Sequence, residues 1–335
     1  MRALVIGGTR NLGPSIVQAL LERGYDVTVF NRGVTSDDLP PDVKRVHGDR
    51  RDPSQLKTAL TDGDFHLVVD TILYNGAEAQ AVVELFSGHV GRYIFISTGQ
   101  VYLVRLGLER PFKEQDYAGP VMPEPSRDND NHYQNWLYGH EKRQAEDVFT
   151  SAWEERRFPY TSLRLPMVNS ERDHYYRIYN YIRRIQDGGP ILIPDGPGLP
   201  IRHIYGEDVV QAITRVAQAR TGIGSAYNIG QDESVSIDDF LQRLASLVGK
   251  PLNFLRVPRA TLERAALLPY CSPFSGAWMS SLDNTLSKNQ LGMRYTPFWP
   301  YVEKLVAFFG HNLPQKNEGY DRRQDELRLA AEFSK

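Results

Sequence analysis

Cysteine is nearly absent from this sequence. The 335 residues include one cysteine, Cys271, which has no partner for an internal disulfide. Proteins of oxidising compartments often depend on disulfides, so this scarcity is typical of a reducing compartment. We therefore expect a cytoplasmic protein in which Cys271 packs as a small hydrophobic side chain and is not a nucleophile.

Long apolar runs and a strong net charge are also missing. No stretch approaches the roughly 20 apolar residues of a membrane helix. The N-terminus passes from Met1 and Arg2 into a strand-like run without the pattern of a signal peptide. The formal net charge of -2 gives no concentrated positive field for a nucleic acid or a membrane. We therefore expect neither as a partner.

Motifs of several other functional classes are absent. The histidines show no HExxH or paired spacing that would build a zinc site. Asp128, Asp130 and His132 alternate in RDNDNH, but the glycine and distal glutamate of an EF-hand are missing. Without a GxSxG elbow or a P-loop lysine, hydrolase and kinase chemistry are disfavoured. We predict no metal site.

Strand-like and helix-like patterns alternate through the first hundred residues. A short apolar run, a glycine-rich turn, an amphipathic stretch and a second apolar run follow within about 30 residues, which is typical of a βαβ unit. Strands are expected at residues 3–7, 26–30, 66–70 and 92–97, and helices at 14–23 and 77–86. The sequence therefore predicts an α/β fold with a doubly wound parallel sheet.

Regularity lapses between residues 103 and 136. This stretch is polar, aromatic and dotted with proline, and it is longer than an ordinary connection, so we interpret it as a functional loop or a lid. Four tyrosines lie further along, at positions where they either stack on a substrate ring or belong to the core: Tyr175, Tyr176, Tyr179 and Tyr181. Beyond the lapse we expect a helix from residue 137, a strand at 160–166, helices at 177–186 and 236–248, and a helical tail from 322.

The first glycine-rich turn has the pattern of a phosphate-binding loop. In VIGGTRNLG, Gly7 and Gly8 follow the first strand, and Gly13 opens a helix with Pro14 at its first position. Such a turn brings main-chain N–H groups and the helix dipole against a pyrophosphate. The alternative is a tight turn without a ligand.

Two arginines replace the residues that an NAD site usually carries. An acidic residue near the end of the second strand usually binds the adenosine ribose, but this chain has Asn31, Arg32 and Gly33 there. Arg32 and Arg10 of the loop could converge on one ribose, and planar guanidinium groups suit a 2′-phosphate. NADP is therefore the preferred cofactor, with NAD as the alternative. Both arginines could instead be solvated, and Asp49 either contacts the adenine amino group or only forms a turn.

A tyrosine and a lysine are spaced for redox chemistry in YGHEK. Residues four apart share a helix face, so the Lys142 ammonium is expected beside the Tyr138 phenol. The positive charge favours the phenolate, and a phenol of lowered pKa can exchange a proton with a hydroxyl or carbonyl oxygen during hydride transfer. Thr98, or less favourably Ser97, follows a strand and could hold the same oxygen. The alternatives are a solvent-facing pair and a strand-end threonine that bonds a main-chain carbonyl.

Six segments in order resemble one protein family. GGTRNLG, STGQVY, YGHEK, LRLPMV, IRHIYGEDVV and AYNIG are similar to segments of the extended short-chain dehydrogenase/reductases, also called the NAD-dependent epimerase/dehydratase family. The resemblance covers nearly the whole chain. It implies a Rossmann domain over residues 1–165, with an insert at 103–136. It also implies a mainly substrate-binding domain over 166–335, some of whose segments return to the Rossmann core, and often a homodimer.

The resemblance also assigns residues to roles. Thr98, Tyr138 and Lys142 match the catalytic Ser/Thr, Tyr and Lys of the family. The expected cofactor-binding residues are Gly7, Thr9, Arg10, Asn11, Leu12, Gly13, Asn31, Arg32, Asp49, Arg50, Tyr138, Lys142, Pro166 and Val168. The expected substrate-binding residues are Thr98, Gln100, Asn169 and Arg202, the last matching a residue that holds the diphosphate in sugar-nucleotide members.

The chain departs from the family in three places. Sugar-nucleotide 4,6-dehydratases of the family have a segment like STDEVY, whereas this chain has STGQVY, with Gly99 and Gln100 in place of the Asp and Glu. The carboxylates for water elimination are therefore missing, and dehydration is disfavoured. An HLAA-like segment is replaced by DTILYN at residues 70–75, which changes the expected surroundings of the nicotinamide ribose. GGTR with NRG also resembles a divergent branch of chloroplast stem-loop RNA-binding proteins and natural-product ketoreductases. Members of that branch often lack the Tyr and Lys pair that this chain keeps.

Three functions follow from these patterns. The first is an NAD(P)-dependent oxidoreductase or epimerase that acts at a hydroxyl or carbonyl carbon of a sugar nucleotide. The second is an NADPH-dependent ketoreductase for a bulkier ketone, favoured if Arg202 pairs internally with Glu207 or Asp208. The third is a non-catalytic NADP-binding module that recognises RNA or protein, disfavoured by the near-neutral charge.

Overall fold

The chain forms two compact units. The computed structural model describes residues 1–60, 63–196, 198–314 and 317–333. The first unit consists of Met1–Pro166, Gly206–Gly230 and Ser280–Tyr295, and the second of Met167–Tyr205, Gln231–Met279 and Thr296–Lys335. None of the helices in the described ranges combines the length and the apolar character that a bilayer crossing requires.

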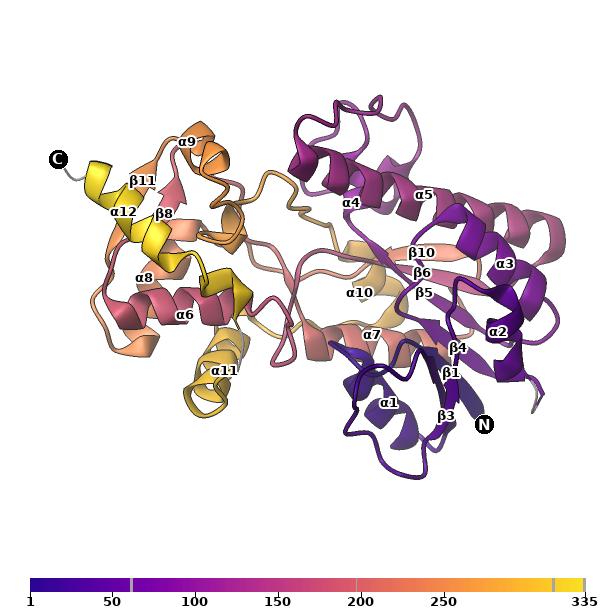
Figure 1. The fold of residues 1–335 in the computed structure, drawn as a ribbon. Coiled ribbons are helices and arrows are strands. Elements are labelled where there is room, and N and C mark those ends of the chain that lie inside the picture. The colour runs from indigo at the N-terminus through magenta and orange to yellow at the C-terminus, as the bar shows by residue number, and fades with distance from the viewer. Residues whose placement is uncertain (61–62, 197, 315–316, 334–335) are drawn as a thin grey trace. The chain divides into compact units, whose positions relative to one another are not determined.

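A seven-stranded parallel sheet is the centre of the first unit (Figure 1). Its strand order is β10 (Ser225–Asn228), β6 (Tyr160–Leu165), β5 (Tyr93–Thr98), β4 (Leu67–Asp70), β1 (Arg2–Ile6), β2 (Asp26–Asn31) and β3 (Lys44–His47). The central strands are buried along their length, as both faces are covered by helices. The predicted doubly wound parallel sheet is thereby confirmed.

Helices cover both faces of this sheet. On one face, α1 (Gly13–Leu21) packs against α7 (Gly206–Gln218), and on the other α3 (Gly76–Phe86) packs against α5 (Asp130–Arg156) (Figure 1). Aromatic and aliphatic side chains from β4, β5, α3 and α5 form one continuous core cluster. The remaining helices of the unit are α2 (Pro53–Lys57), α4 (Gln100–Leu103), α10 (Thr285–Leu291) and the 3₁₀ turns η1 (Thr58–Leu60) and η2 (Glu114–Tyr117).

The sheet topology determines where a ligand site can form. Because all strands are parallel, their carboxyl ends lie along one edge, and the strand order reverses between β1 and β4. Ligands of open α/β sheets bind outside the carboxyl ends near such a reversal. Gly7, Asn31, Thr98 and Pro166 all lie at or just after a strand end of this edge.

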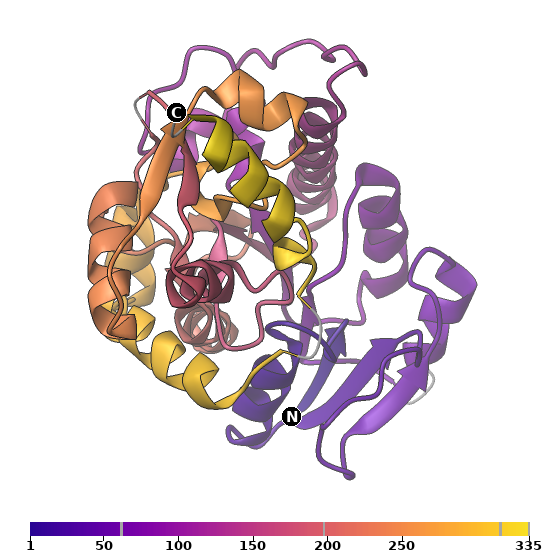
Figure 2. The same ribbon diagram turned by 60° about the vertical axis from the view of Figure 1, so that its left-hand side comes forward.

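The second unit is smaller and mixed. Its core packs α6 (Arg177–Asp187), α8 (Ile237–Val248) and α11 (Phe298–His311) together. β8 (Ile191–Pro194) pairs in parallel with β11 (Phe254–Val257), and α12 (Arg323–Phe333) packs on this pair through Ala330 (Figures 1 and 2). The unit also contains β7 (Val168–Asn169), β9 (Ile204–Tyr205), α9 (Arg259–Arg264) and the turns η3 (Pro273–Ser275) and η4 (Glu318–Tyr320).

The stretch predicted as a loop or lid differs from expectation. α5 begins at Asp130, inside this stretch, because the Asn129 side chain accepts a hydrogen bond from the His132 main-chain N–H at 3.1 Å. Earlier in the stretch, the Tyr117 ring lies between two guanidinium groups, 3.9 Å from Arg143 and 4.4 Å from Arg164. These contacts fix the middle of the stretch against the body of the first unit.

The tyrosine cluster divides between core and surface. Tyr179 and Tyr181 are buried within α6, as the core alternative predicts. Tyr175 is 56% exposed and its ring lies against that of His174, with centroids 3.9 Å apart and the planes tilted by 39°. Only part of the cluster is therefore accessible to a ligand.

Candidate active site

The glycine-rich loop forms a tight turn between β1 and α1. Gly7 and Gly8 have φ values of +107° and +77°, in the region that favours glycine. A Cβ atom on Gly13 would lie 2.6 Å from the Cα of Gly8, so only glycine permits this close approach. Leu12, the N-cap of α1, makes no side-chain capping bond. Of the first helical residues, Gly13 donates its N–H to the Arg10 main-chain oxygen at 2.9 Å and Pro14 has no N–H. The close approach of Gly8 and Gly13 is the backbone shape that a pyrophosphate-binding turn requires.

Arginine side chains gather beside this loop at the ends of β2 and β3. The Arg10 Nε donates to the Thr35 hydroxyl at 3.0 Å, which directs Arg10 toward the segment after β2. Arg51 bonds the Asp49 carboxylate at 2.6 Å and, with a smaller contribution from Arg32, holds the pKa of Asp49 well below its usual range. Arg10, Arg32 and Arg51 are all exposed. The cluster is therefore rich in positive charge that solvent can reach.

Arg50, another expected cofactor contact, has internal side-chain partners. Its guanidinium is buried and pairs with Asp70 at 2.7 Å and with Glu78 at 2.5 Å. Asp70 also accepts a hydrogen bond from the Tyr93 hydroxyl at 2.6 Å. A cofactor contact by Arg50 stays a prediction, whereas its structural role was not visible in the sequence.

The Tyr138 and Lys142 pair lies on the sheet-facing side of α5. The Lys142 Nζ is buried and donates to the main-chain oxygens of Leu73 at 2.6 Å and Ile96 at 2.9 Å. It lies 5.8 Å from the centroid of the Tyr138 ring. Burial lowers the pKa of Lys142 to about 8, although Asp70 acts in the opposite direction. An ammonium has three N–H groups, so one remains for a hydroxyl.

Thr98 and Tyr138 come from segments that are packed closely together. Thr98 ends β5 and is buried, and its hydroxyl accepts a hydrogen bond from the Gln100 N–H at 3.2 Å. A Cβ atom on Gly139 would lie 2.7 Å from the Gln100 carbonyl oxygen, so glycine lets α5 approach α4 directly after Tyr138. The Gln100 side chain also donates to Asn135 of α5 at 3.1 Å. These contacts bring the strand end and the tyrosine segment to one place.

Gly99 has a packing reason for lacking a side chain. A Cβ atom there would lie 2.6 Å from the Cβ of Ser280 and 3.0 Å from a methyl of Leu282. The aspartate that the STDEVY pattern of dehydratases has at this position therefore has no room here. Close packing in the first unit therefore excludes a carboxylate at position 99.

Replacing Gly99 with alanine is expected to lower the free energy of unfolding by about 1 to 3 kcal/mol, because the methyl group overpacks against Ser280. The φ of Gly99 is -66°, so the backbone itself accepts alanine. Guanidinium denaturation measures the change. Gly310→Ala is the matched control, because a Cβ atom there meets nothing within 4 Å. A Gly99→Ala variant as stable as the unaltered protein would contradict the packing argument.

Thr9 and Asn11 lie in the glycine-rich loop of the first unit, and Pro166 ends the long N-terminal segment of that unit, whereas Val168, Asn169 and Arg202 lie in the second unit. Val168 and Asn169 form β7, and the Asn169 amide donates to the Tyr301 hydroxyl at 3.2 Å. The Arg202 Nε donates to the main-chain oxygen of Gln231 at 3.1 Å. Asn169 is buried and Arg202 is half-buried. Each side chain therefore has a fixed partner within its own unit.

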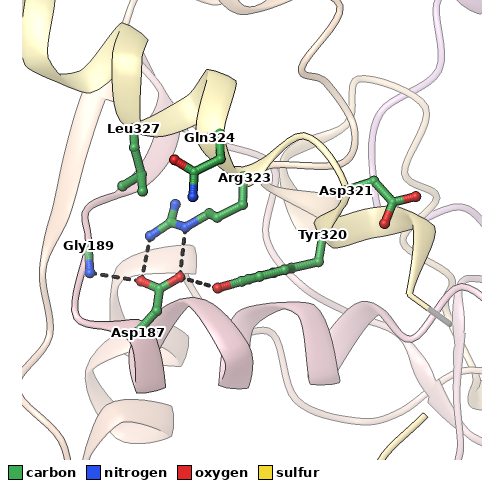
Figure 3. Close-up of a pocket in the computed structure, with 7 residues that line it drawn as sticks. All are labelled: Asp187, Gly189, Tyr320, Asp321, Arg323, Gln324 and Leu327. Carbon is green, nitrogen blue, oxygen red and sulfur yellow. Dashed lines mark hydrogen bonds and ion pairs between the residues drawn. The ribbon is translucent and has the colours of Figure 1, made fainter. Parts of the chain in front are cut away.

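A separate cavity of about 280 Å³ lies in the second unit and contains none of the expected site residues. Figure 3 shows that Asp187 on its wall is bonded to Arg323, to Tyr320 and to the Gly189 N–H. The Asp187 carboxylate is therefore bonded by three other groups of this wall. We interpret the cavity as the seam along which α12 is held to α6.

Comparisons with known proteins bear on the fold and the family of this chain. A family model described as the NAD dependent epimerase/dehydratase family matches residues 3–230. UDP-glucose 4-epimerase of Thermotoga maritima, solved with UDP-glucose, has a TM-score of 0.73 at 20% identity, covering 94% of this chain and all of that one. dTDP-glucose 4,6-dehydratase of Bacillus anthracis, solved with NAD, has a TM-score of 0.71 at 16% identity, covering 93% and 97%. These similarities confirm the predicted fold.

Two relatives found by sequence similarity are described as a stem-loop binding protein and as a reductase. The chloroplast stem-loop binding protein of 41 kDa b of Arabidopsis thaliana is 25% identical over 266 residues, which is 75% of this chain and 64% of that protein. The 2′-dehydrokanamycin reductase of Streptomyces kanamyceticus is 21% identical over 262 residues, which is 77% and 70%. The match thus spans less than two thirds of the first relative. Because the family model covers most of the chain, the protein belongs to the NAD-dependent epimerase/dehydratase family, as the sequence motifs predicted.

Proposed function

We propose that this protein is an NADP-dependent oxidoreductase that interconverts a hydroxyl and a carbonyl group. The observation that carries the proposal is the buried Lys142 ammonium, held by two main-chain oxygens beneath the Tyr138 ring. Such a charge favours the phenolate, so Tyr138 can accept a proton from a substrate hydroxyl and donate one to a substrate carbonyl oxygen. A bound nicotinamide supplies the hydride chemistry. Thr98, at the end of β5, positions the same oxygen.

The loop and the arginine cluster support NADP as the cofactor. The Gly7 to Gly13 turn has the close-packed shape of a pyrophosphate-binding loop. Arg32 lies just after β2, where an acidic residue would discriminate in favour of NAD, and Arg10 of the loop is bonded to Thr35 beyond the same strand. Guanidinium groups bind phosphate with paired, charge-assisted hydrogen bonds, which favours the 2′-phosphate of NADP.

We propose a sugar nucleotide as the first substrate class, bound by the second unit. Arg202 is fixed through its Nε to Gln231, which leaves the terminal nitrogens of the guanidinium to face a diphosphate. A bulkier ketone is the second candidate. It is favoured by the exposed Tyr74 ring, whose centroid lies 5.9 Å from that of Tyr138. It is also favoured by the similarity to an enzyme named as a reductase of 2′-dehydrokanamycin. Epimerisation would leave the cofactor unchanged overall, whereas reduction would consume NADPH.

Replacing Arg32 with alanine is expected to weaken NADPH binding roughly tenfold to a hundredfold, the loss expected for hydrogen bonds to a charged group. NADH binding should change little, because NADH lacks the 2′-phosphate. Calorimetric titration of both cofactors measures the difference. Arg23→Ala is the control, since this exposed arginine bonds the Ala19 carbonyl at the end of α1. Equal binding of the two cofactors by the unaltered protein would overturn the assignment of NADP.

Turnover is then tested with NADPH and two sets of substrates. Oxidation of NADPH by aromatic or polycyclic ketones, with no effect of Arg202→Ala, would favour the ketoreductase. Interconversion or reduction of nucleotide sugars, with KM raised by Arg202→Ala, would favour the first candidate. Binding of neither cofactor would overturn the proposed function and favour the non-catalytic module.

A further inference from the structure

Three aromatic rings surround the Lys142 ammonium. The Nζ lies 4.7 Å from the centroid of Phe95, 5.2 Å from that of Tyr74 and 5.8 Å from that of Tyr138. Together with the oxygens of Leu73 and Ile96, these rings take the place of the water shell of the cation. Phe95 is fully buried, whereas the Tyr74 side chain is 50% exposed. Tyr138 has intermediate exposure, so Tyr74 is the most exposed of the three rings.

The Tyr74 backbone is held by a buried charge network. Glu78 of α3 accepts a hydrogen bond from the Tyr74 N–H at 2.8 Å. It also forms an ion pair with Arg50 at 2.5 Å. Arg50 also pairs with Asp70 at the end of β4. The same short segment presents the Leu73 oxygen to Lys142. Residues 70–75, where the chain departs from its family, thus build one wall of the lysine compartment.

We propose that Tyr74 is a positioning residue that closes the compartment of Lys142 against water and holds the Tyr138 ring beside it. The inference rests on the proposed function for its catalytic meaning, whereas the closure itself is a property of the folded protein. With the compartment closed, the ammonium is poorly solvated and its charge acts on the Tyr138 phenol through an apolar space. Tyr74 thereby couples residues 70–75, where this chain departs from its family, to the working pH of the site.

Several charged groups act on Lys142 besides the aromatic rings. Burial has the largest effect and lowers its pKa, while carboxylates on three elements raise it and one guanidinium lowers it further. These groups are Asp70 of β4, Glu78 of α3, Glu146 of α5 and Arg50. Replacing Tyr74 leaves all four in place. A change seen in the variant therefore reports solvation of the ammonium.

Competitive labelling with trace acetic anhydride tests the proposal, because it measures the pKa and reactivity of each lysine by peptide mass spectrometry. In the unaltered protein we expect Lys142 to react slowly, with a midpoint near its pKa of about 8. In Tyr74→Ala, water reaches the ammonium, so labelling at pH 9 should rise at least about threefold and the midpoint should move up by about one pH unit. Tyr74→Phe keeps the ring and should match the unaltered protein.

The controls separate closure from folding. The exposed Lys44 and Lys113 are internal references whose labelling should not change. Tyr270→Ala removes another half-exposed ring, 49% exposed, and should leave Lys142 unaffected. If Tyr74→Ala unfolds the chain, far-UV circular dichroism reveals it and Tyr74→Leu replaces it. Lys142 labelling that is the same in Tyr74→Ala, or Tyr74→Leu, and the unaltered protein would overturn the proposal.

A second measurement separates this inference from the proposed function. NADPH should protect Lys142 of the unaltered protein from labelling if the cofactor binds beside it. Protection without any effect of Tyr74→Ala would overturn the closure and leave the proposed function standing. Loss of closure in Tyr74→Ala without protection by NADPH would support the closure and overturn the proposed function. Where turnover is found, the alkaline limb of its pH profile should move up in Tyr74→Ala, a change that general destabilisation does not produce.

Discussion

Replacing Tyr138 with phenylalanine is expected to lower kcat by about a hundredfold to ten-thousandfold, the range that a positioned proton donor contributes. The phenyl ring keeps the packing against Tyr74 but has no hydroxyl to exchange a proton with the substrate oxygen. The Lys142 ammonium keeps its bonds to Leu73 and Ile96. NADPH affinity should therefore change less than threefold, as measured by calorimetry beside steady-state turnover.

Tyr133→Phe is the matched control for this experiment. Tyr133 lies on the same helix, and its ring packs 6.1 Å from that of Trp136. Loss of its hydroxyl should leave kcat within about a factor of two, because it lies outside the site. If Tyr138→Phe retained full turnover, Tyr138 would not be the acid/base, although the fold and cofactor site would be unaffected.

Local sequence patterns predicted the parts of this molecule that depend on neighbours in the chain. The periodicity of apolar residues predicted β1, β2, β4 and β5, and the spacing of four predicted that Tyr138 and Lys142 share a face of α5. β3 was missed, because KRVH is a short edge strand with no buried run. The start of α5 was misplaced because Asn129 caps it within a polar stretch that lacks a regular apolar pattern.

The surroundings of the site could not be read in the same way. Lys142 bonds a carbonyl 69 positions away in the chain, and Arg50 pairs with Asp70 across 20 positions. Main-chain acceptors leave no mark in a sequence, and an ion pair becomes visible only when the fold brings its members together. DTILYN was recognised as a departure from the family. Its consequence, an aromatic ring over the lysine compartment, required the structure.

A buried ion pair stabilises the helix that carries Tyr138. Glu146 lies one turn after Lys142 on α5 and pairs with Arg164 of β6 at 2.5 Å, with both side chains at most 5% exposed. Glu146 also accepts a hydrogen bond from the Ser97 hydroxyl at 2.5 Å, next to Thr98 at the end of β5. The pair thereby joins α5 to the two strands whose ends border the site. Breaking it should affect stability more than any surface substitution on α5.

Glu146→Gln is expected to lower the free energy of unfolding by about 3 to 5 kcal/mol, because it leaves the Arg164 charge buried without a counter-charge. Guanidinium denaturation followed by tryptophan fluorescence measures the loss. The control Glu154→Gln, at an exposed position of the same helix, should change stability by about 0.5 kcal/mol or less. Removing both charges in Glu146→Leu with Arg164→Met should recover part of the loss, since no lone charge remains. If Glu146→Gln were as mild as the control, solvent would have to reach Arg164, and α5 would be less firmly held to β5 and β6 than their contacts indicate.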